Sequence, residues 1–209
     1  MNICHIFAGG TLGNVRREWL SEHSGLVICA DCGLLHAEKL GIKPDIIVGD
    51  FDSYCGELPD VPEIHRSVPE KDDTDTMLAV KLAIERGCGL IYLYGALGGE
   101  RFDHAVANLQ TMIYARECGA ELVLIGNETV RLQGEGERVY PRADGDRYFS
   151  VFAVTETVQI QRLSGVKYPL ESYTMKRSFP IGVSNEIIDR EAVLSVGSGL
   201  VLVVQSKKQ

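Results

Sequence analysis

Short runs of apolar, β-branched residues alternate with helical patterns over the first 126 residues of the chain. Five runs predict strands, over residues 3–8, 26–30, 45–48, 90–94 and 122–125. Two helices are predicted over residues 74–86 and 103–117, and each is followed by a glycine suited to end a helix. Strands that alternate with helices are typical of a parallel sheet built from βαβ units.

After residue 127 the pattern changes to short alternating segments separated by Gly, Asp and Pro. Strands are predicted over residues 148–155, 158–163 and 199–204. The change indicates an all-β second domain. Its boundary is expected between residues 126 and 138, where Gly134-Glu135-Gly136 marks a turn or linker.

Composition narrows the class of protein. With 209 residues, 45% of them hydrophobic, the chain can bury one sizeable core or two small ones. The net charge of −8 argues against nucleic acid or an anionic membrane as the main partner. That charge is concentrated in residues 45–75, which hold ten acidic and two basic residues, so the rest of the chain is neutral. A solvated acidic face is the simplest alternative explanation of such a cluster.

Six cysteines are spread through a chain that is too large and too apolar to depend on disulfides. Cys29 and Cys32 have the C-x-x-C spacing, but the second pair of a zinc site does not follow, so redox or zinc chemistry is disfavoured. The apolar runs fall short of the roughly 20 residues that a membrane span needs. Without a signal-peptide pattern at Met1, we expect a soluble, cytoplasmic protein with reduced thiols.

Two carboxylates follow the third predicted strand, in the sequence Gly49-Asp50-Phe51-Asp52-Ser53. In an extended backbone Asp50 and Asp52 lie on the same side, about one pleat apart. Two close carboxylates repel each other unless a cation lies between them, and Mg²⁺ is the ordinary solution. The alternative is a turn or helix cap, because Asp and Ser favour those positions.

A second acidic group, Lys71-Asp72-Asp73-Thr74-Asp75, precedes the helix predicted from residue 74. A helix N-terminus attracts phosphate through its N–H groups and its dipole, and Lys71 adds a positive charge. Asp73 or Thr74 is also expected to cap the helix, but capping does not explain three aspartates and a lysine together.

A third group joins a strand end to a helix start, with Gly98-Gly99 followed by Arg101, Asp103 and His104. The fork of Arg101 suits bidentate recognition of phosphate, although an ion pair with Asp103 is the alternative. For His104 a structural role is favoured over a catalytic one. Asn108 lies four residues later, on the same face of the helix, and is a possible ligand contact.

Two further positions follow strand ends. Asp31 comes after the second strand, just before Gly33, and could face the same cleft. For Gly9-Gly10 after the first strand, a tight turn is favoured over phosphate contact.

In combination these motifs resemble the thiamine pyrophosphokinase (thiamine diphosphokinase) family, which makes thiamine diphosphate from thiamine and ATP. The match is ordered and nearly full-length. It rests on ADCG at 30–33, GIKPD at 41–45, GDFDS at 49–53, KDDTDT at 71–76, RFDH at 101–104, ANL at 107–109, GVKYPL at 165–170 and SNE at 184–186. The chain departs from the family pattern at Cys32, where glycine is usual, and at Glu100, which lengthens the link to Arg101.

The resemblance implies an α/β fold class: a three-layer α/β catalytic domain with a mainly parallel sheet over residues 1–130, and an all-β sandwich over residues 131–209. It implies that the sandwich binds thiamine and forms a homodimer. The residues implied in catalysis are Asp50, Asp52, Asp75, Arg101 and Asp103, of which Asp50, Asp52 and Asp75 hold Mg²⁺. Those implied in ATP binding are Asp31, Gly33, Lys71, Thr74, Arg101, His104 and Asn108. Ser184 and Asn185 are implied to touch thiamine.

In the expected reaction the hydroxyethyl oxygen of thiamine attacks the β-phosphorus of ATP and AMP leaves, with positioning and charge neutralisation dominating the rate. Asp103 either orients Arg101 or contacts a metal ion, and the sequence does not distinguish these two roles. Two other hypotheses remain: a metal-dependent phosphatase that uses Asp50 as nucleophile and Asp52 as acid, and a non-catalytic module that binds a metal and a small molecule or a protein.

Overall fold

The computed structural model describes residues 1–15, 17–51, 59–66, 73–99, 101–143, 145 and 147–208. The chain divides into two compact units, Met1–Asn127 and Glu128–Gln209. Among the described residues, no helix is both long and apolar enough to span a membrane.

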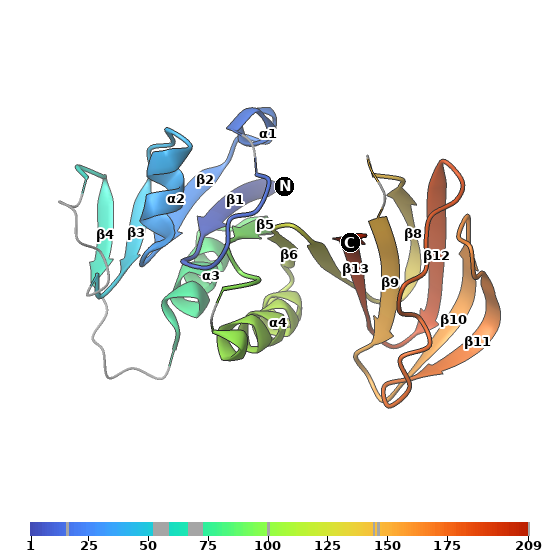
Figure 1. The fold of residues 1–209 in the computed structure, drawn as a ribbon. Coiled ribbons are helices and arrows are strands. Elements are labelled where there is room, and N and C mark those ends of the chain that lie inside the picture. The colour runs from blue at the N-terminus through green and yellow to red at the C-terminus, as the bar shows by residue number, and fades with distance from the viewer. Residues whose placement is uncertain are drawn as a thin grey trace. The chain divides into compact units, whose positions relative to one another are not determined.

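The first unit is built on a parallel sheet whose strands lie in the order β4-β3-β2-β1-β5-β6 (Figure 1). Every neighbouring pair in this sheet is parallel. The strands are β1 (Asn2–Phe7), β2 (Leu26–Ala30), β3 (Ile46–Gly49), β4 (Glu63–Arg66), β5 (Cys88–Tyr94) and β6 (Glu121–Ile125). The chain first builds outward from β1 through β2 and β3 to β4, then crosses back to place β5 on the other side of β1.

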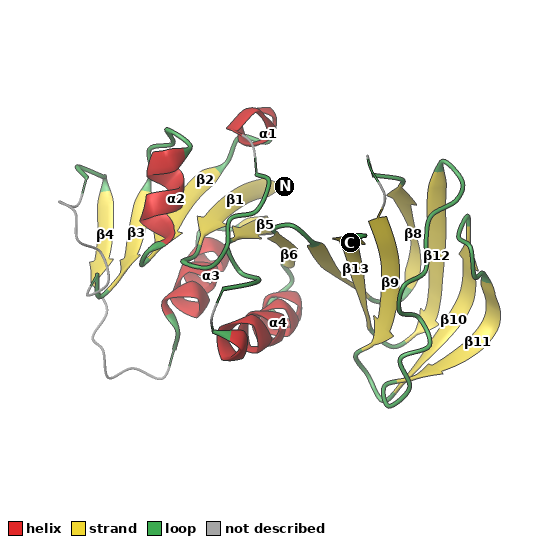
Figure 2. Cartoon of the chain, in the orientation of Figure 1, coloured by secondary structure: helices red, strands yellow, loops and turns green. Residues whose placement is uncertain are grey.

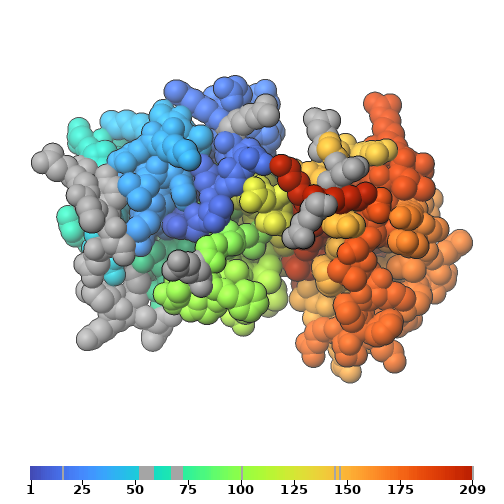
Figure 3. All heavy atoms as spheres, viewed as in Figure 1, coloured from blue at the N-terminus to red at the C-terminus, as the bar shows by residue number. Residues whose placement is uncertain are grey.

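Helices cover both faces of this sheet, as predicted for a three-layer domain (Figure 2). The helices are α1 (Arg17–Glu22), α2 (Gly33–Lys39), α3 (Asp75–Glu85) and α4 (Phe102–Glu117). Helix α4, drawn in green, lies at the surface of the unit in the all-atom view (Figure 3). The two predicted helices end as expected, since Gly87 and Gly119 follow their last turns with φ of 76° and 82°.

The centre of the sheet is buried because its strands carry continuous apolar runs, as strands covered on both faces must. In β1 the last four residues are buried, and in β5 the last four are buried as well. Helix α2 packs so closely on β1 that a Cβ at Gly33 would lie 1.9 Å from the carbonyl oxygen of Phe7. Only glycine permits this approach.

The second unit contains two antiparallel sheets, in the orders β7-β13-β9 and β11-β10-β12-β8. The strands are β7 (Thr129–Gln133), β8 (Gly136–Pro141), β9 (Arg147–Ala153), β10 (Thr157–Ser164), β11 (Leu170–Lys176), β12 (Glu191–Ser198) and β13 (Val201–Lys207). Alternate residues of both sheets point into one shared apolar core, which includes Phe149 of β9, Ile160 of β10 and Val203 of β13. The predicted all-β sandwich is thereby confirmed.

Several elements were not predicted from the pattern: α1, α2, β4, β7, β8, β11 and β12. Helices α1 and α2 have six and seven residues, too few for a helical period to stand out. Strand β4 has four residues, of which three are exposed, so it carries no buried apolar run. The cysteines in the described part of the chain, Cys4, Cys29, Cys32, Cys88 and Cys118, form no disulfide.

A buried histidine lies in the central strand. His5 of β1 is 1% exposed, and its Nε2–H donates to the carbonyl of His23. Because a carbonyl only accepts, the neutral ring carries its proton on Nε2, and Nδ1 accepts from the hydroxyl of Tyr94 at 3.0 Å. Burial lowers the pKa of His5 from its ordinary value of 6.5.

This histidine should make stability depend on pH. Below about pH 6.5 the unfolded chain takes up a proton at His5 that the folded chain resists, so stability falls as pH falls. We expect the urea midpoint to decrease from pH 7 to pH 5, with a contribution from His5 of at most about 1.4 kcal/mol per pH unit. His5→Gln should flatten this dependence even if it lowers stability at pH 7; an unchanged slope would contradict the assignment.

Candidate active site

The strand order reverses between β1 and β5, and ligands of open α/β sheets bind at such points beyond the carboxyl ends of the strands. A cavity of about 260 Å³ lies there. It is lined by Ala8, Gly9, Gly10, Ala30, Asp31, Cys32, Thr74, Asp75, Thr76, Gly95, Ala96, Gly98, Gly99, Arg101, His104 and Asn108.

The cavity brings together six of the predicted site residues: Asp31, Thr74, Asp75, Arg101, His104 and Asn108. Within the described ranges, Gly33, Asp50 and Asp103 are not part of its lining. Asp52 and Lys71, together with Glu100, lie outside the described residues. The described residues alone contain no group of three or more His, Cys, Asp or Glu side chains arranged to hold a metal ion.

Asp31 occupies an unusual backbone position at the end of β2. Its φ of 46° lies in the left-handed region, and its N–H donates to the carbonyl of Val48 at 2.8 Å. Strained backbone of this kind clusters at functional sites. Among the described residues, Oδ1 of Asp31 is buried and accepts no hydrogen bond. A buried carboxylate oxygen of this kind suits a cation or a ligand donor.

Two glycine loops form the floor of the cavity and are tied to each other. The N–H of Gly10 donates to the carbonyl of Gly95 at 2.9 Å. His36 of α2 contacts the carbonyl of Gly10 through Nε2 at 2.7 Å, and Nδ2 of Asn108 donates to the carbonyl of Ala96 at 2.8 Å. Asn108 therefore holds a loop, in addition to any ligand that it contacts. No motif in the sequence pointed to His36.

Arg101 and Asp103 form the ion pair that the sequence left as an alternative. Nε and Nη2 of Arg101 donate to the two carboxylate oxygens of Asp103 at 3.0 and 2.7 Å. The hydrogen bonds from the Arg101 guanidinium lower the pKa of Asp103 to about 2. The pair leaves Nη1 of Arg101 with two further N–H donors, which suit a phosphate oxygen.

The acidic segment before α3 has structural roles that can be assigned. Oγ1 of Thr74 accepts from the N–H of Met77 at 3.1 Å, so Thr74 is the N-cap of the helix, as expected. Asp73 forms an ion pair with Lys81 at 2.6 Å. Asp75 occupies the first turn of α3 and lines the cavity. Capping and pairing thus account for Thr74 and Asp73.

In the second unit, Ser184 is exposed and has a φ of 57°, whereas Asn185 is only 5% exposed. Oδ1 of Asn185 accepts from the N–H groups of Tyr168 and Glu186, and Nδ2 donates to the carbonyl of Tyr168. Most of the hydrogen-bonding capacity of this amide is therefore used within the protein.

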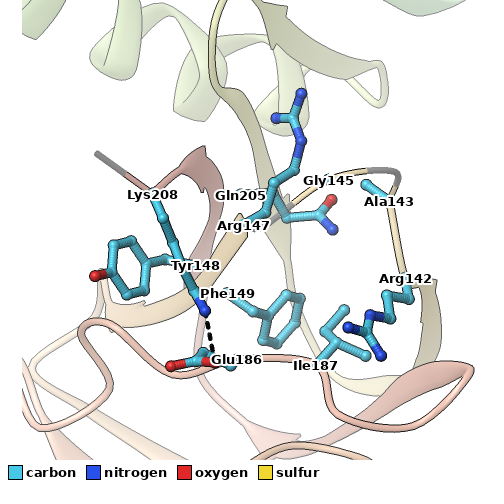
Figure 4. Close-up of a pocket in the computed structure, with 10 residues that line it drawn as sticks. All are labelled: Arg142, Ala143, Gly145, Arg147, Tyr148, Phe149, Glu186, Ile187, Gln205 and Lys208. Atoms are coloured by element: carbon cyan, nitrogen blue, oxygen red, sulfur yellow. Dashed lines mark hydrogen bonds and ion pairs between the residues drawn. The ribbon is translucent and has the colours of Figure 1, made fainter.

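A smaller pocket of about 30 Å³ also lies in the second unit (Figure 4). Its lining includes Phe149, Ile187 and Gln205 and the charged residues Arg142 and Lys208. Nζ of Lys208 donates to Oε2 of Glu186 at 2.8 Å, the bond drawn as a dashed line in Figure 4.

Comparison with known proteins gives the family. The model of the thiamin pyrophosphokinase catalytic domain matches residues 17–124, and the model of the thiamin pyrophosphokinase vitamin B1 binding domain matches residues 138–201. The chain belongs to the thiamine pyrophosphokinase family. The resemblance inferred from the sequence motifs is thereby confirmed.

Individual members of the family match this chain over nearly its full length. Thiamine pyrophosphokinase of Bacillus subtilis (strain 168) is 28% identical over 214 residues, which cover 99% of each chain. A crystal structure of thiamine pyrophosphokinase from Bacillus subtilis covers 100% of both chains with a TM-score of 0.86 and 25% identity. A thiamin pyrophosphokinase family protein from Enterococcus faecalis also covers 100% of both, with a TM-score of 0.85 and 26% identity.

His36 offers a test of how the glycine loops of this family member are held. His36→Ala removes the contact with the carbonyl of Gly10, and we expect the KM for ATP to rise roughly 3- to 10-fold, the worth of one hydrogen bond. His36→Gln keeps a donor and should recover much of the loss. Lys39→Ala, an exposed change on the same helix, is the control. Steady-state kinetics at varied ATP measure the effect, and equal KM values for wild type and His36→Ala would contradict it.

Proposed function

We propose that the chain transfers the pyrophosphoryl group of ATP to the hydroxyethyl oxygen of thiamine, giving thiamine diphosphate and AMP. The observation that carries the proposal is the cavity beyond β1, β2 and β5, where Asp31, Asp75 and Arg101 face the same space as two glycine loops. Membership of the thiamine pyrophosphokinase family supports the same reaction.

We propose that Mg²⁺ binds near the carboxyl ends of β2 and β3, where acidic residues follow the strands. Asp31 and Asp50 follow the neighbouring strands β2 and β3, whose register pairs Ala30 with Val48. Asp31 and Asp75 line the cavity, whereas Asp50 lies outside its lining. The buried Oδ1 of Asp31 supports a cation in this region, because carboxylate oxygens are ligands that Mg²⁺ prefers. We propose Asp50, Asp52 and Asp75 as its ligands. When bound, Mg²⁺ would neutralise charge on the phosphates.

The side chains of this chain would supply positioning and charge. Arg101, oriented by Asp103, would donate Nη1–H groups to the phosphoryl oxygens on which negative charge develops. The glycine loops would let the backbone approach the phosphates closely. Thr74 and Lys71 would hold the polyphosphate. Asp31, Gly33, His104 and Asn108 complete the proposed ATP site. One of the aspartates would accept the proton from the hydroxyl of thiamine.

The second unit would bind thiamine at Ser184 and Asn185, which lie within the segment matched by the vitamin B1 binding domain. We propose residues 1–130 as the catalytic domain and residues 131–209 as the thiamine-binding and dimerisation domain of a homodimer in the cytoplasm. Light scattering on the purified protein tests the dimer: a monomer at micromolar concentration would contradict it.

The reaction is tested by AMP formation from ATP and Mg²⁺, with and without thiamine. Wild type should form AMP only with thiamine. Asp75→Asn should lower the rate about 100-fold or more, because it removes a negative charge at the cavity. The amide is close in size to the carboxylate, so the fold should be kept, and the melting temperature is measured to check this. Asp189→Asn makes the same chemical change at an exposed position of the second unit and should keep full activity.

Two outcomes would contradict the proposal. Release of phosphate from simple esters without a nucleotide would favour a phosphatase that uses Asp50. Binding of thiamine by a well-folded wild type that forms no AMP would favour a non-catalytic module.

A further inference from the structure

Phe51 combines a strained backbone with a buried ring. It stands between Asp50 and Asp52 in the sequence, and its φ of 62° lies in the left-handed region. Bulky side chains rarely adopt this conformation. The extended backbone considered for Asp50 and Asp52 is therefore not kept at Phe51. Strain of this kind persists only where the surrounding structure holds it, and it clusters at functional sites.

The contacts of the Phe51 ring show what holds it. The residue is only 9% exposed and belongs to the same apolar core as Leu34 of α2 and Ile47 of β3. The guanidinium carbon of Arg66, at the end of β4, lies over the ring, 5.7 Å from its centroid. Because the ring is packed on the core and covered by a cation, it fixes the position of its own backbone.

Gly49 lets the ring come close to the end of β2. A Cβ at Gly49 would lie 3.4 Å from Cε1 of Phe51 and 3.2 Å from both N and Cα of Asp31. The N–H of Asp31 donates to the carbonyl of Val48 at 2.8 Å. The ring of Phe51 and the backbone of Asp31 therefore both lie against the last residue of β3. Asp50, which joins Gly49 to Phe51, follows a strand end that is held from two sides.

Core packing alone does not explain this geometry, because an apolar ring can also be buried from an unstrained backbone. The strain falls on the residue between two of the aspartates proposed to bind Mg²⁺. We propose that Phe51 is a positioning residue, whose buried ring holds the left-handed backbone and thereby presents the carboxylate of Asp50 to the metal ion. This inference rests on the proposed function, since it takes Mg²⁺ as the cation.

The first test measures metal-dependent binding without turnover. Calorimetry of the full-length protein gives the Kd of a non-hydrolysable ATP analogue in EDTA and in Mg²⁺, and the ratio of the two values reports the contribution of the metal. Phe51→Leu should lower this ratio roughly 10-fold, as expected when a group that orients a metal ligand is lost. Phe51→Gly, which adopts the left-handed backbone without strain but has no ring, should lower it at least as much.

A matched control separates this effect from a general loss of stability. Phe149→Leu makes the same change at a buried ring of the second unit and should leave the ratio within about 2-fold of wild type. Thermal melts check that each variant is folded at the assay temperature. A variant that only loosens the fold weakens binding in both conditions and leaves the ratio unchanged. An unchanged ratio in folded Phe51→Leu and Phe51→Gly would overturn the proposal.

A double-variant cycle tests whether Phe51 acts through Asp50. Asp50→Asn should lower the ratio, and Phe51→Leu should add little in that background, because both changes affect the same ligand. Effects that multiply would show that Phe51 acts independently of Asp50, which would overturn the positioning role. A wild type that binds the analogue equally well in EDTA and in Mg²⁺ would overturn the metal site of the proposed function itself. A metal-dependent wild type with unaffected Phe51 variants would overturn only this inference.

Discussion

The close approach of backbone segments around the end of β1 is the constraint on which the first unit depends. A Cβ at Gly33 would lie 1.9 Å from the carbonyl of Phe7, and one at Gly10 would lie 2.4 Å from the carbonyl of Gly95. Neither position can accept a side chain without movement of the backbone. Because these contacts bring α2 and the loop after β5 against β1, they also define the floor of the cavity.

Half of the residues that line the cavity are Gly or Ala, and the polar side chains around it divide into two groups. The side chains of His36 and Asn108 bind backbone carbonyl groups of the two glycine loops. Asp103 pairs with Arg101. Asp31 and Asp75 line the cavity. If the proposed site is correct, these contacts would hold its charged groups in place before a nucleotide binds, which is the condition for electrostatic stabilisation of phosphoryl transfer.

Much of this organisation could be predicted from the sequence. Buried parallel strands give apolar runs, and α3 and α4 are long enough to show a helical pattern and a terminal glycine, so both were found. Short elements such as α2 were not predicted. The role of His36, which lies on α2, was therefore not predicted either. Motif order identified the family, but could not reveal that the amide of Asn185 is turned toward Tyr168, because that depends on contacts between segments 17 residues apart. The sequence left the ion pair of Arg101 with Asp103 as one of two alternatives, and the structure shows this pair.

A crystal structure of the protein with Mg²⁺ and a non-hydrolysable ATP analogue would test the proposed site itself. We predict phosphate oxygens within hydrogen-bond distance of Arg101 and of the loops at Gly10 and Gly99, with Mg²⁺ between the phosphates and the aspartates. Phosphates bound elsewhere, with the cavity beyond β1 and β5 left open, would contradict this assignment.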